Sequence, residues 1–209
     1  MFPKEYLPHL RACVPRGFSA MCDNNRMTGK KIPPDQMTEA ELEELAFHNI
    51  SVARLVKLSN PMGAWMELES PIEKNEVMEC LAQGKEKLCH TPLWSSVLFG
   101  KDKGMTPQQC RENHIAKIAY FVKNPIEKPI SMDVGVPSMG HTPGHLIDDG
   151  HHRLAGSFIA GRRFIPAHVG GEVSHAKSLG LWKPNRYQAE LDRRWEASLN
   201  NRSKSTPGP

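Results

Sequence analysis

The segment from Ile147 to Gly171, IDDGHHRLAGSFIAGRRFIPAHVGG, limits the possible folds of this chain more than any other part. A short apolar strand ends in an Asp-Asp-Gly turn, and apolar residues then recur at helical spacing as far as Gly161. The run FIPAHVGG predicts a further strand. A short apolar helix between two strands is buried by packing on their sheet, so we expect an α+β fold with a small mixed sheet.

Other local signals predict further elements of the same kind. Thr38 and Glu41 form a capping box for a helix over about 38–48, and Thr106 with Pro107 begins a strong helix, TPQQCRENHIAKIAYFVKN. The expected elements also include a helix over 72–85 ended by Gly84, strands over 49–59, 63–71, 128–137 and 145–150, and a mixed-charge amphipathic helix over 186–199. The stretch 91–100 fits a strand or a helix, and residues 200–209 are expected to be disordered.

This pattern suggests four regions. Residues 1–37 form an irregular arm and 38–112 an N-terminal α/β elaboration. Residues 113–172 form the core, and 173–209 a C-terminal helix and tail. Among 209 residues, 39% are hydrophobic and 24% charged, which is typical of a globular protein. Five cysteines without a CxxC pair are expected to be free thiols.

The Asp-Asp-Gly turn carries the polar residues that suggest chemistry. Gly150 allows a sharp bend, after which the free N–H groups of a helix start can bind an anion. Arg153 adds a planar donor fork suited to phosphate oxygens. His151 and His152 are candidates for general acid or base, and Asp149 for orienting a histidine. The alternative is a capped helix with exposed histidines.

Three carboxylates are candidate ligands for a divalent cation such as Mg²⁺ bound together with phosphates: Asp148, Asp149 and, in the loop before the strand at 130–136, Glu127. Asp133, within that strand, is expected either to face inward and pair with Arg153 or a metal, or to face outward. His114 and Lys117 lie one turn apart on the preceding helix, and we interpret them as ordinary surface residues.

A formal net charge of +4 permits contact with nucleic acid. A basic rim for a nucleic-acid backbone is predicted from Arg162, Arg163, Lys30 and Lys31. Arg193 and Arg194 are interpreted as a solvated helix face, and Trp182 and Tyr187 as core or lid aromatics that could also stack on bases. No apolar run reaches membrane-spanning length and no secretory h-region is present, so we expect a cytoplasmic protein without membrane contact.

The stretch DDGHHRLAGSFIAGRRFIPAHV resembles the ParB/sulfiredoxin superfamily, in which a glycine is followed by an arginine at the start of a helix. The string Asp149–Arg153 is similar to the motif of the family's free-serine kinases, and NPIEKPISMDVGV looks like its neighbouring strand. The resemblance covers roughly Asn113 to Gly171. The cysteine that precedes His-Arg in sulfiredoxin is replaced by His151, so sulfiredoxin chemistry is not expected.

The resemblance implies binding of ATP or another nucleotide at this turn. It favours a nucleotide-hydrolysing, Mg²⁺-dependent DNase, and a plasmid- or phage-encoded member such as a fertility-inhibition protein fits by analogy. Two alternatives stay open: a non-catalytic nucleotide-sensing or DNA-binding regulator on the same fold, and a small-molecule kinase.

Overall fold

The computed structural model describes residues 32–63, 65, 68–91 and 104–204. The chain divides into two units, Met1–Met37 and Thr38–Pro209. In the first, the described residues contain one short 3-10 helix, η2 (Pro34–Gln36). All the other elements belong to the second unit, which is an α+β fold as the sequence predicts.

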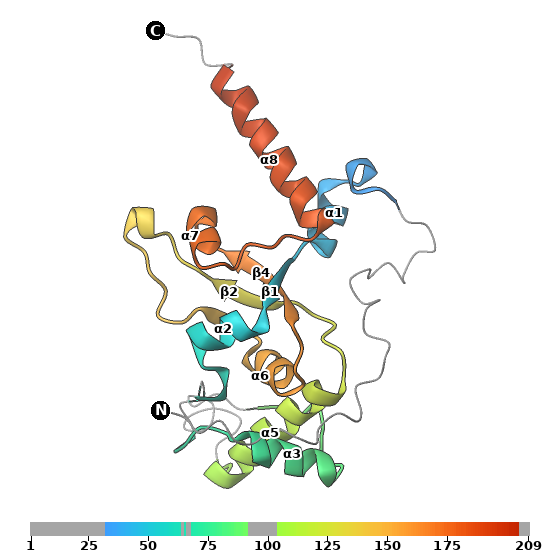
Figure 1. The fold of residues 1–209 in the computed structure, drawn as a ribbon, viewed down its shortest axis with the longest axis vertical. Coiled ribbons are helices and arrows are strands. Elements are labelled where there is room, and N and C mark those ends of the chain that lie inside the picture. The colour runs from blue at the N-terminus through green and yellow to red at the C-terminus, as the bar shows by residue number, and fades with distance from the viewer. Residues whose placement is uncertain (1–31, 64, 66–67, 92–103, 205–209) are drawn as a thin grey trace, which may run out of the picture. The chain divides into compact units, whose positions relative to one another are not determined.

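A four-stranded mixed sheet forms the centre of the second unit (Figure 1). Its strands are β1 (His48–Ser51), β2 (Ile130–Asp133), β3 (Ile147–Asp149) and β4 (Phe164–Gly170). In the order β1-β4-β2-β3, the central pair β2 and β4 is parallel, and β1 and β3 are antiparallel to their neighbours. This strand order pairs β1 with β4, although the two strands are more than 100 residues apart in the sequence.

Helices precede and follow the strands along the chain, most of them at the positions that the sequence predicts. They are α1 (Glu39–Leu45), α2 (Val52–Ser59), α3 (Lys74–Ala82), α5 (Pro107–Lys123), α6 (His151–Ile159), α7 (Val173–Ser178) and α8 (Arg186–Lys204), with 3-10 turns η3 (Pro61–Gly63) and η4 (Pro137–Met139). The capping boxes at Thr38 and Thr106 are both formed. No helix among the described residues has the length and apolar character needed to cross a bilayer.

Helix α6 lies between two hydrophobic clusters, and this position explains its apolar sequence. Leu154 belongs to a cluster that joins the sheet with α2 and α7, whereas Ala155 packs in a second cluster with α3 and α5. Leu154, Ala155, Gly156 and Ser157 are all buried. A helix that is covered on several sides needs apolar residues around most of its circumference.

Two predicted strands are wrong. The strand expected over 49–59 ends at Ser51, because the Ser51 side chain accepts a hydrogen bond from the N–H of Arg54 and begins α2. Helical spacing then buries Val52 and Leu55. The described residues within 63–71 form no strand, because Asn60 adopts a left-handed conformation and Pro61 begins η3.

Other boundaries differ from the predictions as well. The first helix ends at Leu45 rather than near 48, because His48 already pairs with Ala167 in the sheet. Helix α7 has no counterpart in the predictions, and α8 continues into the expected disordered end as far as Lys204. The ambiguous stretch 91–100 lies outside the described residues from position 92. The described cysteines, Cys80, Cys89 and Cys110, are free thiols as expected.

Candidate phosphate site at the start of α6

A single residue turns the chain from β3 into α6. Gly150 has φ 109°, in the left-handed region, and a Cβ built there would lie 2.4 Å from Cγ2 of Ile130. Both the conformation and the close approach to β2 therefore require glycine. The first hydrogen bond of α6 runs from the N–H of Leu154 to the carbonyl of Gly150, so the preceding N–H groups belong to the open first turn of the helix.

The guanidinium group of Arg153 is bound to protein acceptors. Its Nη1 donates to the carbonyls of Lys128, at 3.0 Å, and Pro129, at 2.7 Å. Its Nη2 bonds the carboxylate of Asp149. Because the Arg153 side chain is only 12% exposed, this arginine ties the turn to the loop before β2. Any phosphate that binds Arg153 has to compete with Asp149, whose side chain is 77% exposed.

His152 points into the interface between α5 and α6 instead of facing the turn. Its Nε2 lies 2.7 Å from Nδ1 of His114, and the ring of Trp65 packs against both imidazoles, with centroid distances of 4.9 Å. Burial lowers the pKa of His114 to about 4 and that of His152 to about 2. Both rings are therefore neutral near pH 7, and one donates to the other.

The interpretation of His114 and Lys117 as surface residues is wrong. His114 is 1% exposed, because α5 packs on α6 along the face that also carries Ile118. Lys117, one turn further, is half-buried and donates from Nζ to Oγ1 of Thr91 at 3.1 Å. The spacing of four residues between His114 and the buried Ile118 was the available signal.

With Arg153 bound to protein acceptors and His152 buried against His114, Lys117 and His151 are the remaining candidate groups for binding a ligand near the turn. Burial lowers the pKa of Lys117, and its charge interacts with those of Asp149 and Arg153. His151 is half-buried at the first position of α6, and burial, with the neighbouring His145, lowers its pKa. Lys117 thus interacts electrostatically with Asp149 and Arg153 at the start of α6, where the imidazole of His151 also lies, and this combination is suited to binding an anion.

The carboxylates that were expected to ligate a metal do not converge. Asp149 binds Arg153, whereas Asp148, the preceding residue of β3, lines a cavity of about 560 Å³ together with Asp133 and His168. Oδ1 of Asp133 accepts the N–H of Gly135 at 2.7 Å and its Oδ2 lies 3.9 Å from Nε2 of His141, so its contacts are with these groups and not with Arg153. Glu127 is exposed in its loop. Within the described residues, no three metal-ligating side chains are grouped.

The predicted nucleic-acid rim is only partly on the surface. Arg162 turns inward and donates to the carbonyls of Phe121 at 2.6 Å and Asn124 at 2.7 Å, so it closes the end of α5 and is not a rim residue. Arg163 is exposed, and Lys30 and Lys31 lie outside the described residues.

The aromatic and basic residues near the C-terminus follow the expected structural roles. Arg193 and Arg194 both bond Glu190, as expected of a solvated helix face. Tyr187 is 9% exposed and Trp182 packs against the sheet cluster. The ring of Trp182 also contacts that of His48, with the centroids 4.3 Å apart and the planes tilted by 50°.

Comparison of the sequence with protein-family models gives no match. Searches of curated proteins and of solved structures also find no match.

Proposed function

We propose that this chain binds the phosphate groups of a nucleotide or of DNA at the turn between β3 and α6, and that water attacks a bound phosphorus there and breaks its phosphoanhydride or phosphodiester P–O bond. The observation that supports this function is the gathering of Lys117 and Arg153 around the start of α6, next to Asp149. Cationic side chains combined with free helix N–H groups form a favourable environment for phosphate oxygens. Because Arg153 is occupied by Asp149, Lys117 is the cation best suited to receive a phosphate first.

His151 is the candidate acid-base group of the proposed reaction. It is the histidine of the pair at 151 and 152 that is not engaged with His114. Since its pKa is lowered, its neutral form predominates near neutral pH, and a neutral imidazole can accept a proton from an attacking water. Arg153, once freed from Asp149, would stabilise charge that develops on the phosphoryl oxygens.

A ParB-like, nucleotide-hydrolysing DNase is the specific form of this proposal, and it rests on the sequence resemblance. Its action on transferred DNA follows from analogy alone. The described residues form no metal cage, but Mg²⁺ commonly binds through one or two carboxylates together with substrate phosphates. Asp149 or Asp148 would be the carboxylate that binds Mg²⁺, and the ion would neutralise negative charge on the substrate phosphates.

A non-catalytic nucleotide sensor is the second candidate, and the burial of His152 favours it. A neutral imidazole that is hydrogen-bonded to another buried imidazole cannot exchange protons with a bound ligand. This leaves His151 as the only histidine at positions 151 and 152 that could support turnover.

Binding and turnover of defined substrates test the proposal. The full chain is titrated with ATP and CTP, and incubated with Mg²⁺ and plasmid or single-stranded DNA. Lys117→Met should weaken nucleotide binding roughly tenfold, the loss expected for one charge-assisted hydrogen bond. The matched control is Lys85→Met, an exposed lysine after α3, which should leave binding unchanged.

The outcomes separate the alternatives. Cleavage or nucleotide hydrolysis that is lost in His151→Gln supports the enzyme. Binding that depends on Lys117 without any turnover supports the sensor. Phosphate transfer from ATP or ADP to free serine, with DNA left intact, would identify a kinase instead. Equal nucleotide binding by Lys117→Met and Lys85→Met would refute the phosphate site.

A further inference from the structure

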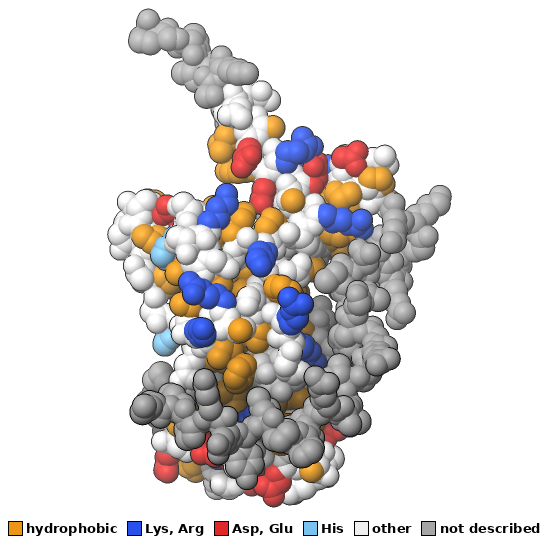
Figure 2. Space-filling model, in the orientation of Figure 1, with side chains coloured by type: hydrophobic (Ala, Val, Ile, Leu, Met, Phe, Trp, Pro, Cys, Tyr) orange, Lys and Arg blue, Asp and Glu red, His pale blue; other side chains and the backbone are white. Residues whose placement is uncertain are grey.

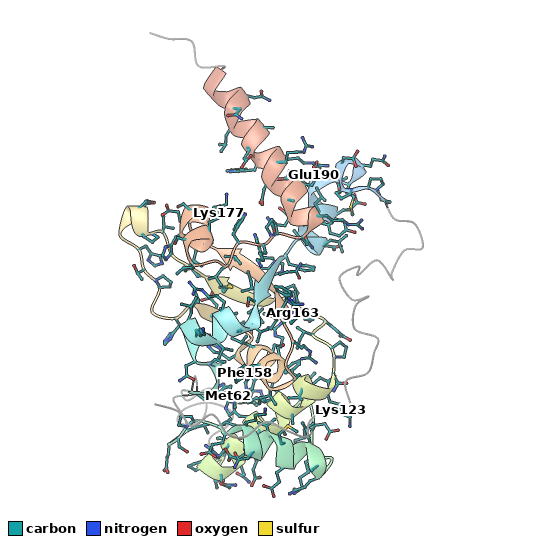
Figure 3. All side chains as sticks on the ribbon, viewed as in Figure 1. Met62, Lys123, Phe158, Arg163, Lys177 and Glu190 are labelled. Atoms are coloured by element: carbon teal, nitrogen blue, oxygen red, sulfur yellow. The ribbon has the colours of Figure 1, made fainter. Side chains whose placement is uncertain are left out.

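Five exposed cations come from segments that contact one another: Arg54 and Lys57 on α2, Arg163 before β4, Lys177 on α7 and Lys183 after it. We call this set the basic face. Figure 2 shows Lys and Arg side chains spread among hydrophobic ones over α2, β1 and α7, whereas most acidic side chains in this view lie toward α8 and toward the opposite end, with one beside α7. Figure 3 marks Arg163 and Lys177 at two points of this face.

None of these five residues forms a salt bridge with an acidic group among the described residues. Some cations elsewhere in the described structure are paired, as Arg111 is with Glu76 and Arg194 with Glu190, whereas Lys74, Lys85 and Lys87 near α3 form no salt bridge with a described residue. Like charges that are gathered without counter-charges repel one another, and such a face is retained at a cost to stability. This arrangement is typical of a surface that meets a polyanion.

Tertiary contacts hold the face together, because its members come from distant parts of the sequence. Nε of Arg54 donates to the carbonyl of Leu179 at 2.9 Å, which joins α2 to the end of α7. The N–H of Asn49, in β1, donates to the carbonyl of Lys183 at 2.7 Å. The charges are therefore fixed on a folded framework.

An exposed aromatic ring lies among these cations. Phe164, the first residue of β4, is 43% exposed. The guanidinium of Arg163 lies 5.7 Å from its ring centroid and Nζ of Lys183 lies 5.4 Å from it. Cations beside an accessible aromatic ring are the combination that binds single strands, in which the bases are free to stack.

We propose that the basic face binds a single-stranded nucleic acid, with its cations on successive phosphates and Phe164 stacked on a base. A duplex offers the same phosphates but keeps the faces of its bases covered, so Phe164 gives the single strand its advantage. This surface shares no residue with the turn at α6 and does not depend on the function proposed there.

The test measures binding of a labelled oligo-dT of about 20 nucleotides to the full chain by fluorescence anisotropy. For five phosphate contacts, wild-type affinity should fall roughly 100-fold between about 50 and about 200 mM salt. The variant Lys57→Gln/Lys177→Gln/Lys183→Gln should bind more weakly and reduce the slope of log K against log salt by about 2. Phe164→Leu should weaken binding roughly tenfold with the slope unchanged.

The matched control is Lys74→Gln/Lys85→Gln/Lys87→Gln, which removes the same charge from exposed lysines on and after α3. Its affinity should stay within about twofold of wild type. Equal losses in the two triple variants would overturn the location. Equal binding of oligo-dT and an oligo-dT·oligo-dA duplex, with no effect of Phe164→Leu, would overturn the assignment to a single strand.

Failure of this proposal is distinguishable from failure of the phosphate site. The triple variant of the basic face should bind ATP as wild type does, and Lys117→Met should bind oligo-dT as wild type does. Circular dichroism and the thermal midpoint of each variant confirm that the fold is retained.

Discussion

Acidification should unfold this chain through its buried imidazole pair. His114 and His152 share a hydrogen bond of 2.7 Å in the interface between α5 and α6, beneath Trp65. Both have a pKa below the ordinary value of 6.5 because burial disfavours the charged ring. In the unfolded chain, where water surrounds them, they take up protons near pH 6.5.

The direction of the effect follows from proton uptake. Between pH 6.5 and about 4 the unfolded chain binds more protons at His114 than the folded chain does. The contribution of neutral His114 to the free energy of unfolding is therefore fully present above pH 6.5, and it is lost as the pH falls from 6.5 to about 4. A pKa lowered from 6.5 to about 4 corresponds to about 3 kcal/mol for His114 alone. That is a large fraction of a typical stability of about 5–15 kcal/mol.

Urea unfolding at a series of pH values from about 7 to about 4 measures this loss. The comparison is His114→Gln/His152→Gln, in which two neutral amides can still donate and accept but cannot become charged. His48 and His151, whose pKa values are also lowered by burial, remain in both proteins and cancel in the comparison. The double variant should lose clearly less stability across this window. Parallel curves for the two proteins would refute the reasoning.

Three substitutions, with Gly161→Ala as a control for the first, test the elements that build the site, each by urea or thermal unfolding. Gly150→Ala should cost more than about 3 kcal/mol because of its positive φ and the clash with Ile130, whereas Gly161→Ala, at φ 68° in open space, should cost about 1 kcal/mol. Equal costs would contradict the close approach. Thr106→Ala should cost about 1 kcal/mol through loss of the cap of α5. Leu154→Ala, with a fully buried side chain, should cost about 2 to 5 kcal/mol, and a near-neutral result would contradict the role of α6 in the core.

Local sequence signals predicted the elements whose ends are encoded by a few neighbouring residues. Thr38 with Glu41 and Thr106 with Pro107 begin helices by satisfying free N–H groups, and the turn at Gly150 separates β3 from α6. Each of these signals acts within four residues. The sequence alone therefore located the turn at 149–153 and the α+β class.

The functional geometry depends on long-range packing and could not be predicted in this way. His114 and His152 are 38 positions apart and meet only because α5 packs on α6. The strand β1 ends at Ser51, opposite Phe164 where its antiparallel partner β4 begins, and β-branched residues in α2 gave no sign of that limit. The basic face is assembled from α2, the residue before β4 and the segment around α7, so no single stretch of sequence displays it.

The contact between Asp149 and Arg153 allows two roles for Asp149 when ATP binds: it is displaced from Arg153 by a phosphate, or it ligates a metal ion. In the folded chain the carboxylate of Asp149 already neutralises the guanidinium, and its 77% exposure allows it to move away. If a ligand phosphate replaces this carboxylate, Asp149→Asn removes the competitor and should tighten ATP binding in the absence of Mg²⁺, by roughly tenfold. If Asp149 instead contributes through a metal ion, the same variant should bind ATP no more tightly and should lose the stimulation of binding by Mg²⁺. Isothermal titration of ATP into the wild type and into Asp149→Asn, each with and without Mg²⁺, decides between the two roles. If a phosphate displaces Asp149, the variant gains affinity for ATP. If Asp149 ligates a metal ion, the variant loses the part of the affinity that depends on Mg²⁺.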